Sequence, residues 1–91
     1  MPLRFPVKMA RDVWLALVIN IQTMKKYYVN TQAQHNGDHE VHDEFCQYLP
    51  GVKNRFYLSE FYSCAGAVLR AKNHFDQVNG CKFCSPACHT S

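Results

Sequence analysis

The sequence predicts an α+β fold in which a short antiparallel sheet of about three strands packs on one main helix. Short aromatic and β-branched runs precede a single stretch with helical spacing, and this order indicates strands followed by a helix. The chain has 91 residues, so it forms at most one domain, and so small a core gives little stability. It also has 5 cysteines and 5 histidines. We therefore expect a metal ion or a cross-link to stabilise the domain.

The chain divides near Met24 into an N-terminal arm, residues 1–23, and a domain, residues 24–91. The arm contains an apolar run, residues 13–19, which is much shorter than the roughly 20 residues of a membrane span, so we expect no span. A signal peptide is disfavoured because Asp12 precedes the run and no small-residue cleavage site follows it. A packing helix, an ordered or unordered extension, and a natural start at Met24 remain open for the arm.

Runs that contain aromatic or β-branched residues predict strands at residues 26–29 and 55–58, and residues 40–42 are expected to form a brief strand between them. Asn36-Gly37 is a turn signal between the first run and the brief strand. Residues 43–49 predict either about two helical turns or a tight loop.

One main helix is predicted after Ser63, a residue type that commonly caps helix N-termini. Asn79-Gly80 is expected to end the helix and to lead directly into the cysteine cluster. Cys64 lies on the apolar face and is interpreted as a small core residue. The residues that share this face are Cys64, Ala67, Val68, Ala71 and Phe75.

Two pairs of residues have the spacing of metal ligands. Cys81 and Cys84 are separated by two residues, which lets one turn of backbone aim both sulfurs at a tetrahedral ion. His42 and Cys46 are four positions apart, so one helical turn would bring them to the same side. We predict that these four residues bind one Zn²⁺. Cys88 or His89 in place of His42 is the alternative left open.

The odd number of cysteines favours a metal site over a disulfide framework, because a framework would leave one thiol unpaired. A reduced protein can instead place three or four thiols on a metal ion and bury another. This reasoning predicts a cytoplasmic location.

The residues around these pairs resemble Ada-type metal-binding domains, in which a Cys-x-x-x-Cys pair and a Cys-x-x-Cys pair hold one zinc ion. The resemblance covers residues 41–84 and implies that His42, Cys46, Cys81 and Cys84 are the ligands. The matching strings are Val41-His42-x-x-x-Cys46-x-x-Leu49, Asn54-Arg55-Phe56-Tyr57-Leu58, Ala67-Val68 and Gly80-Cys81-x-x-Cys84.

One departure from that family changes the expected chemistry. In its DNA-repair members, the first cysteine of the early pair accepts a methyl group from a phosphotriester. His42 occupies this position here, and an imidazole is not that sulfur nucleophile. We also expect no room for the accompanying helix-turn-helix domain. The sequence therefore predicts a metal-supported scaffold without methyl transfer.

The expected function is that of a non-catalytic structural-zinc module that binds a macromolecular partner, most simply a protein, through exposed aromatic side chains. Tyr27, Tyr48 and Tyr62 are the candidates. The sequence shows no pair of residues suited to act as catalytic acid and base, so it does not indicate an enzyme. A three-ligand zinc ion with a bound water, leaving His42 unligated, would be the enzymatic alternative.

The second hypothesis is a nucleic-acid-binding accessory domain. The net charge is +3, but residues 24–91 hold seven basic and six acidic residues and so carry only +1. A duplex-binding module usually has a clustered basic face, which this balance does not indicate. The candidate contacts to phosphates are Lys53, Arg55, Arg70 and Lys72, and the candidate stacking residues are Phe56 and Tyr57.

Overall fold

A computed structural model describes residues 23–90, and it has the predicted α+β class. The N-terminal arm expected over residues 1–23 lies outside the described residues apart from Thr23. The elements in chain order are β1 (Lys25–Asn30), β2 (His39–Asp43), the 3-10 turn η2 (Val52–Asn54), β3 (Arg55–Phe61), α2 (Cys64–Ala71), β4 (Val78–Gly80) and the 3-10 turn η3 (Pro86–Cys88).

The sheet has four strands in the order β3-β1-β2-β4. Strand β1 is antiparallel to both β2 and β3, whereas β4 is parallel to β2. The sheet is therefore mixed and has one strand more than the three that the sequence predicted. The extra strand, β4, has only three residues, and its turn-forming sequence Asn79-Gly80 gives no strand signal of its own.

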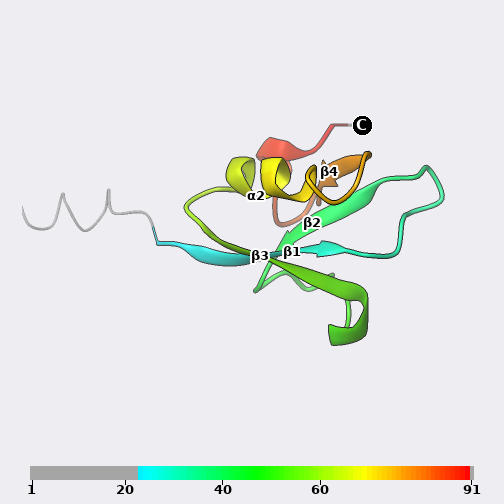
Figure 1. The fold of residues 1–91 in the computed structure, drawn as a ribbon. Coiled ribbons are helices and arrows are strands. Elements are labelled where there is room, and N and C mark those ends of the chain that lie inside the picture. Colours follow the sequence, from blue (N-terminus) through cyan, green and yellow to red (C-terminus); the bar gives the residue numbers. More distant parts are fainter. Residues whose placement is uncertain (1–22, 91) are drawn as a thin grey trace, which may run out of the picture.

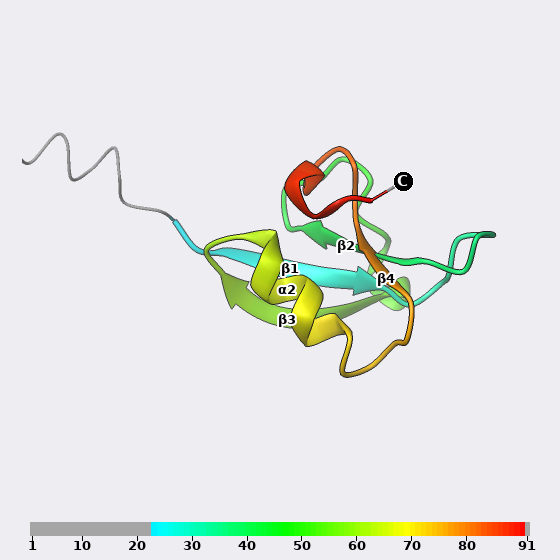
Figure 2. The same ribbon diagram turned by 90° about the horizontal axis from the view of Figure 1, so that it is seen from above.

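Helix α2 covers one face of the sheet, and the C-terminal turn η3 lies on the same side (Figure 1; Figure 2 shows this layer from above). Side chains of β1 alternate between the two faces. Tyr27 and Val29 point to the helix and are buried, at 4% and 0% exposed. Our expectation that Tyr27 is available to a partner was therefore wrong. The buried core is completed by Val41, Leu58, Cys64, Ala67 and Ala71.

Helix α2 is shorter than predicted, because it ends at Ala71 and Phe75 packs on the core from the loop that follows. Ser63 is the N-cap residue as expected, but its side chain makes no capping hydrogen bond. In the part of the chain that the structure describes, no helix has the length and apolar character needed to cross a membrane.

The pairing of β1 with β2 decides where the predicted ligand His42 lies. Val29 pairs with Val41, and both belong to the helix-facing core, whereas Tyr28 pairs with His42. Paired residues share a face of the sheet. His42 therefore projects from the face opposite α2, where the loops after β2 and β4 enclose it.

Candidate metal centre

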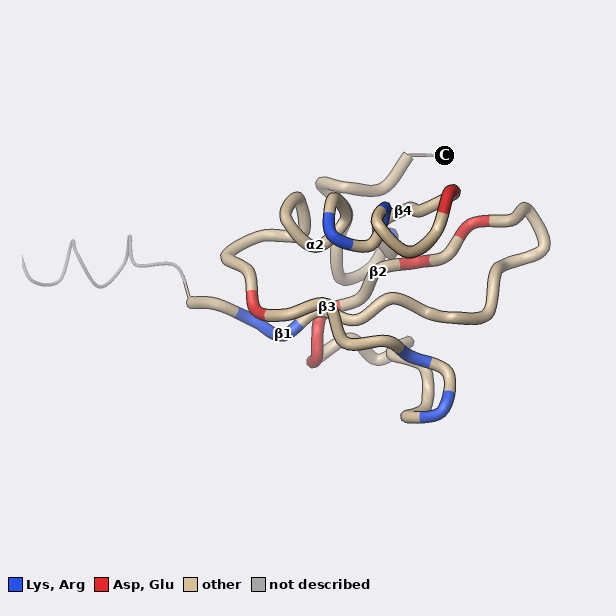
Figure 3. The backbone as a smooth tube through the Cα atoms, viewed as in Figure 1, with Lys and Arg blue, Asp and Glu red and all other residues tan. Residues whose placement is uncertain are grey.

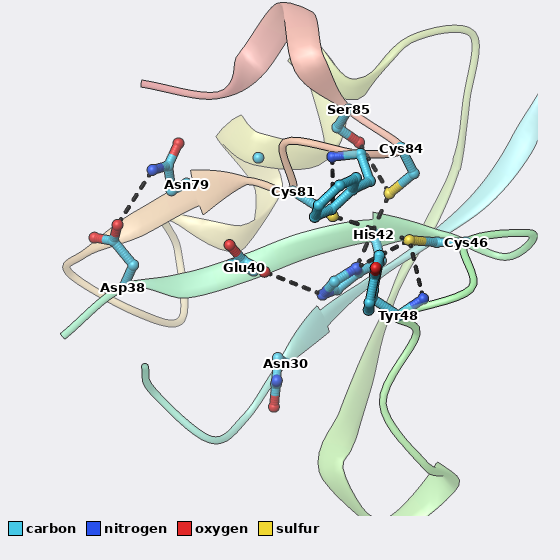
Figure 4. A network of polar contacts seen from close by, with 12 residues as sticks. Asn30, Asp38, Glu40, His42, Cys46, Tyr48, Asn79, Cys81, Cys84 and Ser85 are labelled. Carbon is cyan, nitrogen blue, oxygen red and sulfur yellow. Dashed lines mark hydrogen bonds and ion pairs between the residues drawn. The ribbon is translucent and has the colours of Figure 1, made fainter. Parts of the chain in front are cut away.

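Four side chains from two distant parts of the chain converge beside β2. The potential ligand atoms of His42, Cys46, Cys81 and Cys84 all lie within 4.8 Å of one another, so together they could hold a metal ion. Figure 4 shows the imidazole of His42 with one ring nitrogen directed at the sulfurs of Cys46 and Cys84. These are the four residues that the sequence predicted as ligands.

The first pair is positioned by the end of β2 and the turn after it. His42 belongs to the strand, and the turn brings Cys46 back toward it because Cys46 N donates to Asp43 O (3.2 Å) and Leu49 N donates to Cys46 O (3.0 Å). Residues 43–49 thus form tight turns, the second of the two predicted alternatives.

The second pair is positioned by β4 and its connection to β2. Cys81 directly follows β4, and its N–H continues the ladder by donating to Val41 O (2.9 Å). Ser85 N donates to Cys81 O (2.8 Å) and closes a turn around the Cys-x-x-Cys segment. The short strand β4 therefore fixes Cys81 next to His42.

Three of the six distances between donor atoms are close to those expected around a tetrahedral ion, and the remaining pairs lie within 4.8 Å. With Zn–S near 2.3 Å and Zn–N near 2.0 Å, tetrahedral angles place two sulfurs about 3.8 Å apart and a nitrogen about 3.5 Å from a sulfur. Cys46 Sγ lies 3.9 Å from Cys81 Sγ. His42 Nδ1 lies 3.5 Å from Cys46 Sγ and 3.9 Å from Cys84 Sγ. The donors are therefore spaced to surround a single ion.

Each of the three sulfurs also accepts a backbone N–H. Tyr48 N donates to Cys46 Sγ, Phe83 N to Cys81 Sγ and Asp43 N to Cys84 Sγ, each at 3.4 Å. Donors of this kind stabilise a thiolate relative to a thiol. The backbone thus favours the charged form that a metal ion requires.

Burial opposes the backbone donors, because it disfavours the charged thiolate and so raises the pKa of a thiol. Desolvation raises the pKa of Cys84 to about 12, although the Asp43 N–H partly opposes it. Desolvation also raises the pKa of Cys46. It lowers the pKa of His42, which favours a neutral imidazole. Burial therefore favours the protonated thiols of Cys46 and Cys84 and the neutral ring of His42 when no cation is bound.

The two remaining candidates, Cys88 and His89, are not part of this group. Cys88 forms a disulfide with Cys64, and His89 Nδ1 lies 2.9 Å from Gly80 O. The structure therefore brings His42, and neither of these two residues, together with Cys46, Cys81 and Cys84. Cys64 is in the core as predicted, but as half of a disulfide. Five cysteines thus divide into three free thiols and one bridged pair.

Sequence reasoning did not identify Glu40 as a neighbour of the ligand His42. Its Oε1 lies 3.7 Å from Nε2 of His42. The signal was present, because residues two apart in a strand share a face.

Polar residues where the β1–β2 loop meets β2 make structural contacts. Asp38 accepts hydrogen bonds from Gln77 and Asn79, and His39 stacks on Phe75 with ring centroids 4.0 Å apart.

Three exposed aromatic side chains lie on the loops that carry the thiols, and we call them the aromatic rim. Phe45 is 77% exposed, Tyr48 51% and Phe83 58%. The ring centroids of Tyr48 and Phe83 are 4.6 Å apart. Phe45 and Phe83 border a hollow of about 300 Å³, with Cys46 and Cys84 also in its lining. The exposure of Tyr48 was predicted.

Comparisons of the chain with protein-family models, curated proteins and solved structures found no match.

Proposed function

We propose that this chain is a non-catalytic module in which His42, Cys46, Cys81 and Cys84 hold one structural Zn²⁺ and present the aromatic rim to a protein partner. The observation that carries the proposal is the convergence of the four donor atoms, which all lie within 4.8 Å of one another, with three of the six pairs at 3.5 to 3.9 Å. This spacing supports a single tetrahedral ion.

The donor set favours zinc over the other common divalent ions. Thiolates are soft ligands and disfavour magnesium and calcium, which take oxygen donors. Three thiolates and a neutral imidazole give a net charge of about −1 with Zn²⁺, and the backbone N–H groups that donate to the sulfurs offset part of that charge.

A structural role is favoured over a catalytic one because four protein donors complete a tetrahedral sphere. Catalytic zinc sites keep one position for water or substrate and use three protein ligands. Here His42 is turned toward the sulfurs with its Nδ1, so the three-ligand alternative that leaves His42 free has no support.

The aromatic rim supports protein binding. Aromatic side chains are enriched at the centres of protein interfaces, where rigid rings contribute area at little entropic cost. Tyr48 and Phe83 each follow a ligand cysteine by two residues and are tied to it by an N–H to sulfur contact. A bound ion would therefore hold the rim in place.

Nucleic-acid binding has less support, because the basic residues are dispersed. Figure 3 shows Lys and Arg on β1, near η2 and on α2, with acidic residues between them. Arg55 lies over the ring of Tyr28 and donates to Pro50 O, and Arg70 donates to Leu58 O. Both guanidinium groups are thus engaged within the domain. A salt-dependent shift with single-stranded or duplex nucleic acid would restore this alternative.

The test of the zinc site is native mass spectrometry of the full chain before and after chelation, with circular dichroism in parallel. We expect one zinc ion per chain and unfolding on its removal, since structural zinc contributes about 10 kcal/mol or more of apparent folding energy in small domains. Cys46→Ser and Cys81→Ser should each lose the ion.

The matched control is His35→Ala, since His35 is exposed and outside the ligand group. It should bind zinc as the parent chain does. A chain that binds no zinc, or that keeps its spectrum after chelation, would contradict the proposal.

A further inference from the structure

We propose that the Cys64–Cys88 disulfide is a redox-sensitive clasp that sets the metal affinity of the neighbouring ligand group. In this proposal, the closed clasp holds the turn that carries Cys81 and Cys84, and reduction to two thiols weakens metal binding. The proposal rests on the zinc site proposed above and adds its regulation.

The disulfide connects the metal-binding turn to the rigid part of the fold. Cys64 is the first residue of α2 and belongs to the core. Cys88 ends η3, four positions after the ligand Cys84. The bridge therefore ties the chain segment immediately after the second ligand pair to the helix that covers the sheet.

Cys88 is in direct contact with the residue before Cys81. A Cβ added to Gly80 would lie 2.7 Å from Cys88 Cβ and 2.9 Å from its carbonyl carbon, so the two backbones are closely packed. A displacement of Cys88 would remove the group that presses against the start of the Cys-x-x-Cys segment.

Hydrogen bonds carry the constraint from Cys88 to both ligands of this turn. Cys88 N donates to Ser85 O (2.9 Å), and Ser85 N donates to Cys81 O (2.8 Å). Ser85 is only 2% exposed, and its Oγ lies 3.7 Å from Cys84 Sγ. Cys81 and Cys84 are thus at the end of a short, buried path from the disulfide.

Reduction would release the covalent tie while other contacts keep the tail close. Asn79 Nδ2 donates to Thr90 O (2.7 Å) and Thr90 N donates to Asn79 Oδ1 (2.9 Å). These bonds anchor the tail to β4, and none of them reaches α2. We therefore expect a looser ligand turn and a weaker metal site, with the fold retained while zinc is bound.

The redox step is ordinary thiol–disulfide exchange with a low-molecular-weight thiol. Cys88 is half-buried and Cys64 is buried, so the external thiolate reaches Cys88 Sγ more easily. It forms a mixed disulfide there and releases the Cys64 thiolate, which takes a proton. A second external thiolate then attacks the external sulfur of the mixed disulfide. The products are two protein thiols and one oxidised external disulfide.

The clasp links metal affinity to the redox state of the compartment. Disulfides persist in oxidising compartments and are rare in the cytoplasm. In the cytoplasmic location expected from the cysteine count, the clasp would be open and the metal more easily lost. Pre-organised ligands bind more tightly because less ordering entropy is lost on binding.

The test compares zinc affinity in the two redox states of the full chain. Zinc dissociation constants are measured by competition with a chromophoric chelator for the oxidised chain, for the chain reduced with a phosphine and desalted without oxygen, and for the double variant Cys64→Ser, Cys88→Ser. Alkylation and mass spectrometry verify the thiol count, and circular dichroism verifies that the zinc-loaded samples are folded.

We expect reduction to weaken binding by about tenfold, a typical size for coupled sites. The double variant should match the reduced chain and should not respond to the phosphine. Equal affinity of the oxidised and reduced chains would overturn the clasp while leaving the zinc site intact. Zinc binding by neither form would overturn the zinc site itself. If the double variant does not fold, the comparison of the two parent forms still decides the question.

Discussion

Oε1 of Glu40 lies 3.7 Å from Nε2 of His42, on the side of the imidazole that faces away from the sulfurs. The other nitrogen, Nδ1, lies 3.5 Å from Cys46 Sγ. A metal ion at the cluster would therefore bind Nδ1, and the proton on Nε2 would point to the carboxylate. Carboxylates in this position orient a ligand histidine and increase its basicity.

Glu40→Gln is expected to weaken zinc binding by about tenfold, the lower end of the effect of losing such an outer partner. The amide keeps the shape of the side chain but removes the charge that faces Nε2. Competition titration with a chelator measures the change. Glu60→Gln is the control, because Glu60 is exposed on β3. An equal loss of zinc affinity in both variants would show that the overall charge of the domain causes the effect, and not the contact between Glu40 and His42.

Zinc affinity is expected to fall as the pH falls. Burial raises the pKa of Cys84 to about 12 and raises that of Cys46, so both are thiols in the folded, metal-free chain at neutral pH. Thiols of an unfolded chain are also protonated there. Zinc binding must therefore release their protons. Burial lowers the pKa of His42, so the ring contributes no proton at neutral pH.

Each proton released changes the apparent dissociation constant about tenfold per pH unit. The two thiols alone therefore predict a change of about 100-fold in that constant per pH unit. Calorimetry in two buffers of different ionisation enthalpy counts the protons, and chelator competition between about pH 6.5 and 8 gives the slope. An affinity that does not change over this range would show that the thiols are not the ligands.

His42→Cys is expected to retain one zinc ion, whereas His42→Ala should bind it far more weakly. Nδ1 is the ring nitrogen nearer to the backbone, and a cysteine sulfur can approach the same position. Sites with four cysteines are common for structural zinc. Cobalt substitution and absorption spectroscopy would report the added sulfur. Loss of metal from both variants would indicate that only an imidazole reaches the ion.

Three of the four strands and the ligand group were predictable because each has a local signal. Aromatic and β-branched residues such as those of Tyr27-Tyr28-Val29 are enriched in strands, and the spacing of Cys81 and Cys84 reflects the geometry of one turn. Pairing between His42 and the distant Cys81 was inferred from donor chemistry. These features depend on neighbours in sequence or on the number of ligands that an ion requires.

The features that the sequence did not reveal depend on partners distant in the chain. Strand β4 forms because its backbone pairs with β2, and its own sequence resembles a turn. The burial of Tyr27 follows from which face of β1 the helix covers. Cys64 and Cys88 are 24 residues apart, and an odd cysteine count gave no reason to pair them once three thiols were assigned to a metal.

Gly80→Ala is expected to destabilise the domain by about 1–3 kcal/mol, the usual cost of overpacking. The new methyl group would meet Cys88 Cβ at 2.7 Å and the Cys88 backbone at 2.9 Å. A backbone held by a disulfide cannot rotate away as a flexible side chain can. Cys88 would have to shift, and the turn that carries Cys81 and Cys84 would shift with it.

Gly51→Ala is the matched control, because a Cβ at Gly51 meets nothing within 4 Å and its extended backbone suits alanine. Urea unfolding of the zinc-loaded chains measures both variants. Gly80→Ala should lower the midpoint and also weaken zinc binding, whereas Gly51→Ala should do neither. If Gly80→Ala is as stable as the parent chain, Cys88 yields freely. The close contact could then not transmit the state of the disulfide to the ligands.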